Sequence, residues 1–76
     1  MAQSRKVLLK YVGINQDFKN VYEYSYPDGT LTYEANVQIN KKVTKKLFTT
    51  AREAALEVDK ILLRNGKDPV NILKRK

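Results

Sequence analysis

The sequence contains no cysteine and no histidine among its 76 residues. Without cysteine, no disulfide or thiolate metal site can brace the fold. Without histidine, the usual imidazole metal ligand and the commonest general base are missing. The two serines have no evident base, and the eight acidic residues show no metal-ligand spacing. We therefore expect a protein that is not an enzyme, with no catalytic residues, no metal, no cofactor and no small-molecule substrate.

Long apolar runs are also missing, since none approaches the ~20 residues of a membrane-spanning helix. The opening MAQSRKVLLKYVGI places basic residues before an apolar patch. A secretory signal needs a longer apolar centre and a small-residue cleavage site. The first sixteen residues lack acids, as transit peptides do. We expect no membrane partner and an intracellular location, with the nucleus favoured and an organelle as the alternative.

Positive charge is abundant: 15 lysines and arginines against 8 acids give a net charge of +7. The pI is about 9.8. At this length we expect one small domain with a thin core, because only roughly 60% of the unfolded surface is buried. A basic domain of this kind favours a polyanionic partner. Many small proteins, ribosomal ones especially, are basic without reading any nucleic-acid sequence.

The clearest element is a helix between Thr50 and Gly66. Thr50 and Glu53 predict a capping box, in which the hydroxyl should accept from the Glu53 amide and the carboxylate from the Thr50 amide. Gly66 suits the left-handed conformation at a helix C-terminus, and Pro69 prevents a restart. The apolar positions recur with helical spacing at Ala51, Ala54, Ala55, Val58, Ile61 and Leu62.

The sequence predicts three strands before this helix. The stretch LTYEANVQI alternates, with Tyr33, Ala35 and Val37 on its apolar face. A short turn at Asn40-Lys41 leads to KVTKKLF, and an earlier strand, NVYEYSY, ends at the turn Pro27-Asp28-Gly29. The sequence therefore predicts an α+β fold, with a three-stranded antiparallel sheet packed against one C-terminal amphipathic helix. The helical alanines should lie on the Tyr33/Ala35/Val37 face.

The other face of this sheet is the candidate functional surface. By alternation, Asn36 and Gln38 lie on it, and Tyr22 and Tyr24 lie on it if Val21 points to the core. On the third strand we assign Lys42, Thr44 and Lys46 to the same face. Lysines neutralise phosphates, amides can pair with an adenine edge, and tyrosines can stack on bases. The alternative is that the lysines only protect an edge strand and that the tyrosines belong to the core.

Four segments in order resemble the Apetala/ethylene-response-factor DNA-binding domain. They are FKNV at 18–21, YEANVQ at 33–38, FTTAREAALEVD at 48–59 and Asn71. In the third segment the matching positions are Phe48, Thr50, Ala51, Glu53, Ala54, Ala55 and Asp59. The resemblance covers residues 18–72. It leaves 1–17 as an N-terminal extension, with a docking strand as one interpretation, and 73–76 as a basic tail.

The resemblance implies that the sheet enters the major groove of duplex DNA. Carried over by position, the contacts would come from Lys19, Tyr22, Tyr24, Asn36, Gln38, Lys42 and Thr44. This chain has Tyr22 and Tyr24 where plant members have arginines, and Thr44 where they have tryptophan. Its YPDGTL turn is also longer. The missing arginines argue against a GC-rich site, because arginine with guanine is the commonest specific contact.

We therefore expect a DNA-binding module, acting in transcription regulation. The alternative is a small basic structural or RNA-binding subunit of a larger assembly, organellar or ribonucleoprotein. Leu56 and Leu63 are seven residues apart, on the helix side away from the alanines. Either VLLKYVGI or VNIL folds over these leucines, or a protein partner does.

Overall fold

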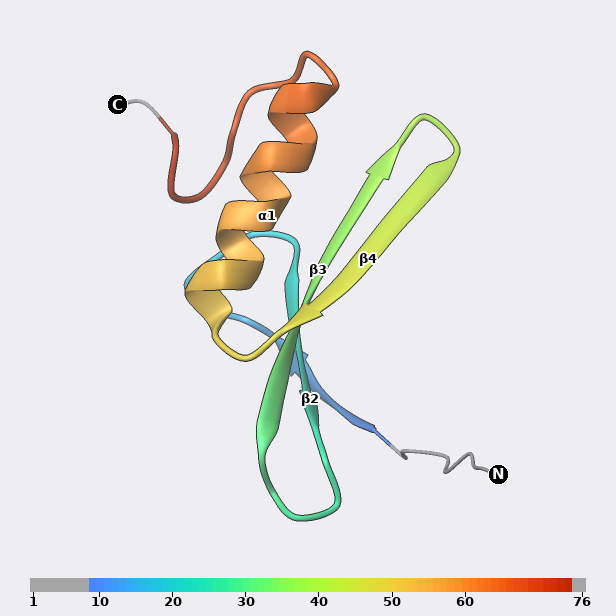
Figure 1. Ribbon diagram of the computed structural model, residues 1–76, viewed down its shortest axis with the longest axis vertical. Helices are drawn as coiled ribbons and strands as arrows, with labels where there is room; N and C mark the ends of the chain where they lie inside the picture. Colours follow the sequence, from blue (N-terminus) through green and yellow to red (C-terminus); the bar gives the residue numbers. More distant parts are fainter. Residues whose placement is uncertain (1–8, 75–76) are drawn as a thin grey trace.

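The computed structural model describes residues 9–74, so parts of the predicted extension and tail, 1–8 and 75–76, lie outside the described residues. Four strands are followed by one helix: β1 (Lys10–Ile14), β2 (Val21–Ser25), β3 (Leu31–Ile39), β4 (Lys42–Phe48) and α1 (Ala51–Arg64). The sheet is antiparallel with the order β1-β2-β3-β4, and α1 covers one of its faces (Figure 1).

The predicted α+β architecture is confirmed, but the sheet formed by residues 9–74 has four strands instead of three. The additional strand, β1, comes from the segment that the sequence analysis assigned to an N-terminal extension. It pairs with β2, with Tyr11 opposite Tyr24 and Ile14 opposite Tyr22, and the register shifts between Tyr11 and Gly13. This β-bulge places one extra residue in β1 and twists the edge of the sheet.

Each hairpin turn is built on a residue with positive φ. In the turn between β2 and β3, Gly29 has φ 93 and donates its N–H to the Tyr26 carbonyl, at 2.9 Å. The Asp28 carboxylate accepts from the Thr30 amide at 2.9 Å. Between β3 and β4, Asn40 has φ 58 in a two-residue connection. Asparagine and glycine are the residues that adopt this conformation at least cost.

The ends of α1 follow the predicted signals, with one difference at the N-terminus. The Thr50 hydroxyl accepts from the Glu53 amide at 3.1 Å. The Glu53 carboxylate accepts from the hydroxyls of Thr49 and Thr50, each at 3.2 Å, where the sequence analysis expected the Thr50 amide. At the C-terminus, Lys67 donates to the Leu62 carbonyl and Gly66 to the Leu63 carbonyl. This is the Schellman pattern, and Gly66 has φ 74.

The core lies between α1 and the middle of the sheet and is made of small side chains. Its buried apolar residues are Val21, Ala35, Val37, Ala54, Ala55, Val58 and Ile61. The alanines of α1 therefore pack on the Ala35/Val37 face, as predicted. With no side chain beyond Cβ on Ala54, Ala55 or Ala35, the helix backbone approaches β3 closely.

The C-terminal segment folds back along α1 (Figure 1) and is held by two polar side chains. Asp59 is fully buried, and its carboxylate accepts backbone hydrogen bonds from Val70 (2.9 Å), Asn71 (2.9 Å) and Leu73 (2.7 Å). The Asn71 side chain accepts from the Lys19 amide at 2.7 Å and donates to the Lys19 carbonyl at 3.0 Å. Asp59 and Asn71 thus join the helix, the C-terminal segment and the loop before β2.

We expect Asp59→Asn to lower the free energy of unfolding by about 1–3 kcal/mol, because hydrogen bonds to a buried charged acceptor are lost. The amide group cannot accept from all three N–H groups with the same geometry, so the Leu73 amide should also lose protection from hydrogen exchange. Urea unfolding and exchange by NMR measure both effects. Asp68→Asn removes the same charge at an exposed position and should change the stability by less than about 0.5 kcal/mol. Equal effects of the two changes would contradict this role for Asp59.

Candidate nucleic-acid interface

The face of the sheet opposite α1, called here the open face, has two halves of different chemistry. Cross-strand partners in an antiparallel sheet share a face, so the register assigns its members. The ribbon half consists of Asn36, Gln38, Val43 and Lys45. The aromatic half consists of Tyr11, Ile14, Tyr22, Tyr24, the buried Thr32, Glu34 and Leu47.

The prediction for β4 was wrong by one residue. Lys42, Thr44 and Lys46 are paired with Ile39, Val37 and Ala35, and so lie on the face that α1 covers. The ion pair between Lys46 and Glu57 of the helix, at 3.3 Å, shows this directly. The reason is the two-residue turn, which places Lys42 opposite Ile39 and therefore on the core side. Val43, Lys45 and Leu47 face the other way.

The ribbon half extends beyond β2. The pairing of β2 with β3 ends at Val21 and Ala35, and the rest of β3 pairs only with β4 in the sheet of the described residues. Figure 1 shows the hairpin formed by β3 and β4 projecting away from the other strands. Asn36 lies opposite Lys45, and Gln38 lies opposite Val43. The segment 36–45 contains three lysines and no acid.

Both amide side chains of the ribbon half are available for a ligand. The Asn36 amide donates to Glu34 at 3.4 Å, and the Gln38 amide donates to the Asn40 carbonyl at 3.3 Å. Both contacts are long for hydrogen bonds, and neither uses the side-chain oxygen. Each amide therefore retains acceptor capacity and a second N–H donor. Their positions agree with the prediction that Asn36 and Gln38 share the open face.

In the aromatic half, three tyrosines from two strands are in contact. The Tyr11 ring lies 5.5 Å from that of Tyr24 in an edge-to-face arrangement and 6.5 Å from that of Tyr22. Tyr22 and Tyr24 point to the open face, as predicted when Val21 is buried. The Tyr24 hydroxyl donates to the Glu34 carboxylate at 3.3 Å. Burial raises the pKa of Tyr24, and the nearby Glu34 charge and hydrogen bond raise it further.

Lys19 lies apart from both halves, in the loop between β1 and β2. Its backbone N–H and C=O are both bonded to Asn71, so the loop is held to the C-terminal segment. Among the described residues, Lys19 is not paired with a residue of a neighbouring strand, whereas the other predicted contact residues are. The structure therefore does not bring Lys19 into the row of open-face side chains.

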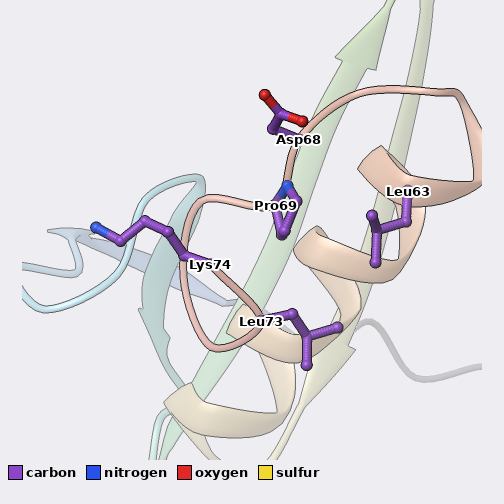
Figure 2. A pocket seen from close by; sticks show the side chains of 5 residues that line it. All are labelled: Leu63, Asp68, Pro69, Leu73 and Lys74. Atoms are coloured by element: carbon purple, nitrogen blue, oxygen red, sulfur yellow. The ribbon is translucent and has the colours of Figure 1, made fainter. Parts of the chain in front are cut away.

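The two leucines predicted to bind a protein partner line separate hollows. Leu56 is half-buried and lines a hollow with Phe48, Glu53, Glu57 and Lys60. Leu63 is 48% exposed and lines another with Asp68, Pro69, Leu73 and Lys74. In Figure 2 the charged ends of Asp68 and Lys74 point away from the leucines. The VNIL segment thus reaches the Leu63 side, which was one of the alternatives left open.

Sequence reasoning missed Lys45, Val43 and Leu47 of β4 and Tyr11 and Ile14 of β1 on the open face. Lys45 could have been assigned from the length of the Asn40-Lys41 turn, because a two-residue connection fixes the pairing of the residues beside it. Tyr11 had no comparable signal, since its place depends on a bulge in β1. Within residues 9–74, no group of three or more acidic side chains is placed to hold a metal ion. The described helix is too short and too polar to cross a bilayer.

The raised pKa of Tyr24 predicts that the free energy of unfolding decreases at high pH. The folded state holds the phenol proton more tightly than the unfolded state, so this contribution is fully present below the ordinary pKa of 10.0. It is lost as the pH rises through the folded pKa. Glu34→Gln should lower the Tyr24 pKa only in part, because burial, the largest single cause of the shift, remains. NMR titration of the ring carbons measures this, and a pKa unchanged by Glu34→Gln would contradict it.

Comparison of the chain with protein-family models, with curated proteins and with solved structures gives no match. The similarity to the Apetala/ethylene-response-factor domain therefore stays a prediction that rests on the quoted residues.

Proposed function

We propose that this protein is a DNA-binding module that inserts the projecting β3–β4 ribbon into the major groove of duplex DNA. The observation that carries the proposal is the ribbon half itself. It brings two amides and one lysine to the same surface, on a segment with three lysines and no acid. A two-stranded β-ribbon fits a major groove about 12 Å wide. The net charge of +7 supplies the long-range attraction to phosphate.

The chemistry of the ribbon divides into reading and positioning. Asn36 and Gln38 can each pair bidentately with the N6 and N7 groups of adenine, and the exposed Val43 can contact a thymine methyl group. Lys45, Lys42 and the turn residue Lys41 are exposed and can contact phosphates along the groove. The sheet offers no arginine, so the proposal favours an adenine-rich site, and transcription regulation is the role that fits such a reader.

Lys45→Ala should weaken binding to all duplex sequences and reduce the slope of log K against log salt by about one. Lys46→Ala is the matched control, because it removes the same charge from the next residue on the helix side of β4. It should reduce affinity less, although it also frees Glu57 from an ion pair. Fluorescence anisotropy with a labelled duplex at several salt concentrations measures both slopes. A larger effect of Lys46→Ala would place the DNA on the other face.

Asn36→Ala with Gln38→Ala should relax sequence preference by roughly 1–3 kcal/mol for each lost bidentate contact. Affinity for non-specific duplex should change little, because phosphate contacts dominate that term. The measurement is selection from randomised duplex DNA by the wild-type and double-variant proteins, followed by affinity measurements on the enriched site. A motif that survives the double substitution unchanged would show that these amides do not read the bases.

The aromatic half favours a second function, a structural or RNA-binding subunit of a larger assembly. Tyr11 and Ile14 are 55% and 63% exposed, and Glu34 adds a negative charge beside them. Such a surface is suited to stacking on unpaired bases or to apolar contact with a protein, and less suited to a phosphate backbone. Binding of a single-stranded RNA pool that exceeds duplex binding at equal salt would favour this function.

A further inference from the structure

The outer edge of β4 presents backbone groups that the sheet of the described residues leaves unpaired. Asn36 directs its backbone toward the β2 side, where its N–H donates to the Asn20 carbonyl at 3.0 Å and its C=O accepts from the Asn20 side chain at 2.9 Å. Residues of an antiparallel strand alternate the side to which these groups point. Lys45, opposite Asn36, therefore points its N–H and C=O outward, as Val43 and Leu47 also do.

The two edges of the sheet are protected in different ways. The β1 edge is short, with five residues, and is interrupted by the bulge before Gly13. The β4 edge has seven residues in a continuous register. Bulges and lysines are both devices that prevent unwanted strand pairing. β4 carries lysines but no bulge. Its edge therefore repels positively charged strands but can still pair with strands that are neutral or acidic.

The charges identify what such a strand must be. Lys41, Lys42, Lys45 and Lys46 lie on β4 or its turn, and β4 has no acid. A second copy pairing through the same edge would bring these lysines together, and like charges on neighbouring strands are destabilising. Residues 1–8 and 75–76 contain no acidic side chain, so they do not complement this edge. The occupant that charge complementarity favours is an acidic strand of another protein.

We propose that β4 binds an acidic, extended segment of a partner protein by strand addition. The outward N–H and C=O groups of Val43, Lys45 and Leu47 would continue the ladder. On the open face, Val43 and Leu47 are 47% and 49% exposed and would take apolar residues, with an acid at Lys45 between them. On the other face Lys42 would take an acid, while Lys46 is already paired with Glu57. The proposal does not rest on DNA binding.

The test uses the full chain, labelled with ¹⁵N, and the peptide acetyl-SVEETVES-amide. On binding, the outward amides of Val43, Lys45 and Leu47 should gain protection from hydrogen exchange. The amides of Thr44 and Lys46 point to β3 and should change little. Two further peptides carry N-methyl groups at alternate positions. The peptide whose methyl groups replace the N–H donors that face β4 should bind about tenfold more weakly than the parent peptide. The peptide methylated on the N–H groups that face away from β4 should bind like the parent.

A charge reversal provides the matched control. The double variant Lys42→Glu with Lys45→Glu should prefer the basic peptide acetyl-SVKKTVKS-amide over the acidic one, which also shows that the edge remains folded. The proposal is overturned if the two methylated peptides do not differ, or if the exchange effects lie only at the tyrosines. It is equally overturned if duplex DNA protects the three outward amides and the acidic peptide does not, since nucleic acid would then be the occupant of this edge.

Discussion

The close approach of α1 to β3 is the constraint on which the rest of the structure depends. Ala54 and Ala55 lie against Ala35 with no exposed surface, and the buried apolar core within residues 9–74 is limited to seven residues. Burial at roughly 25 cal/mol per Å2 gives little stabilisation to side chains this small. The polar contacts at Asp59 and Asn71 consequently carry a large share of the tertiary organisation. They close the loop before β2 and the C-terminal segment onto the same helix.

This arrangement also determines which face of the sheet is left for a ligand. The helix can approach only where the strands present small residues, and β3 presents them on its Ala35/Val37 side. The side chains of Asn36 and Gln38 are then directed away from the helix by the pleat alone. The packing requirement of the helix therefore determines which face of β3 carries the two amides.

Prediction from sequence succeeded where the determining interactions are local. The caps of α1 depend on Thr50, Glu53 and Gly66, which lie within one turn of the helix ends. The β4 register failed because alternation alone permits two assignments, and the lysines were assumed to face solvent. The turn at Asn40-Lys41 carried the missing information, since it fixes Lys42 opposite Ile39. The pairing of β1 depends on contacts with Tyr22 and Tyr24 that no local pattern announces.

The corrected register changes how the positive charge of β4 can act. Were all its lysines on the open face, the strand would present a single phosphate-binding surface. Instead Lys45 faces the open side, Lys42 and Lys46 face the helix side, and the outward backbone lies between them. A duplex laid on the open face and a strand paired along the edge would both use Lys45 and would both cover Val43. The two partners would therefore exclude each other, and an acidic strand would act as a competitor of DNA even without touching Asn36 or Gln38.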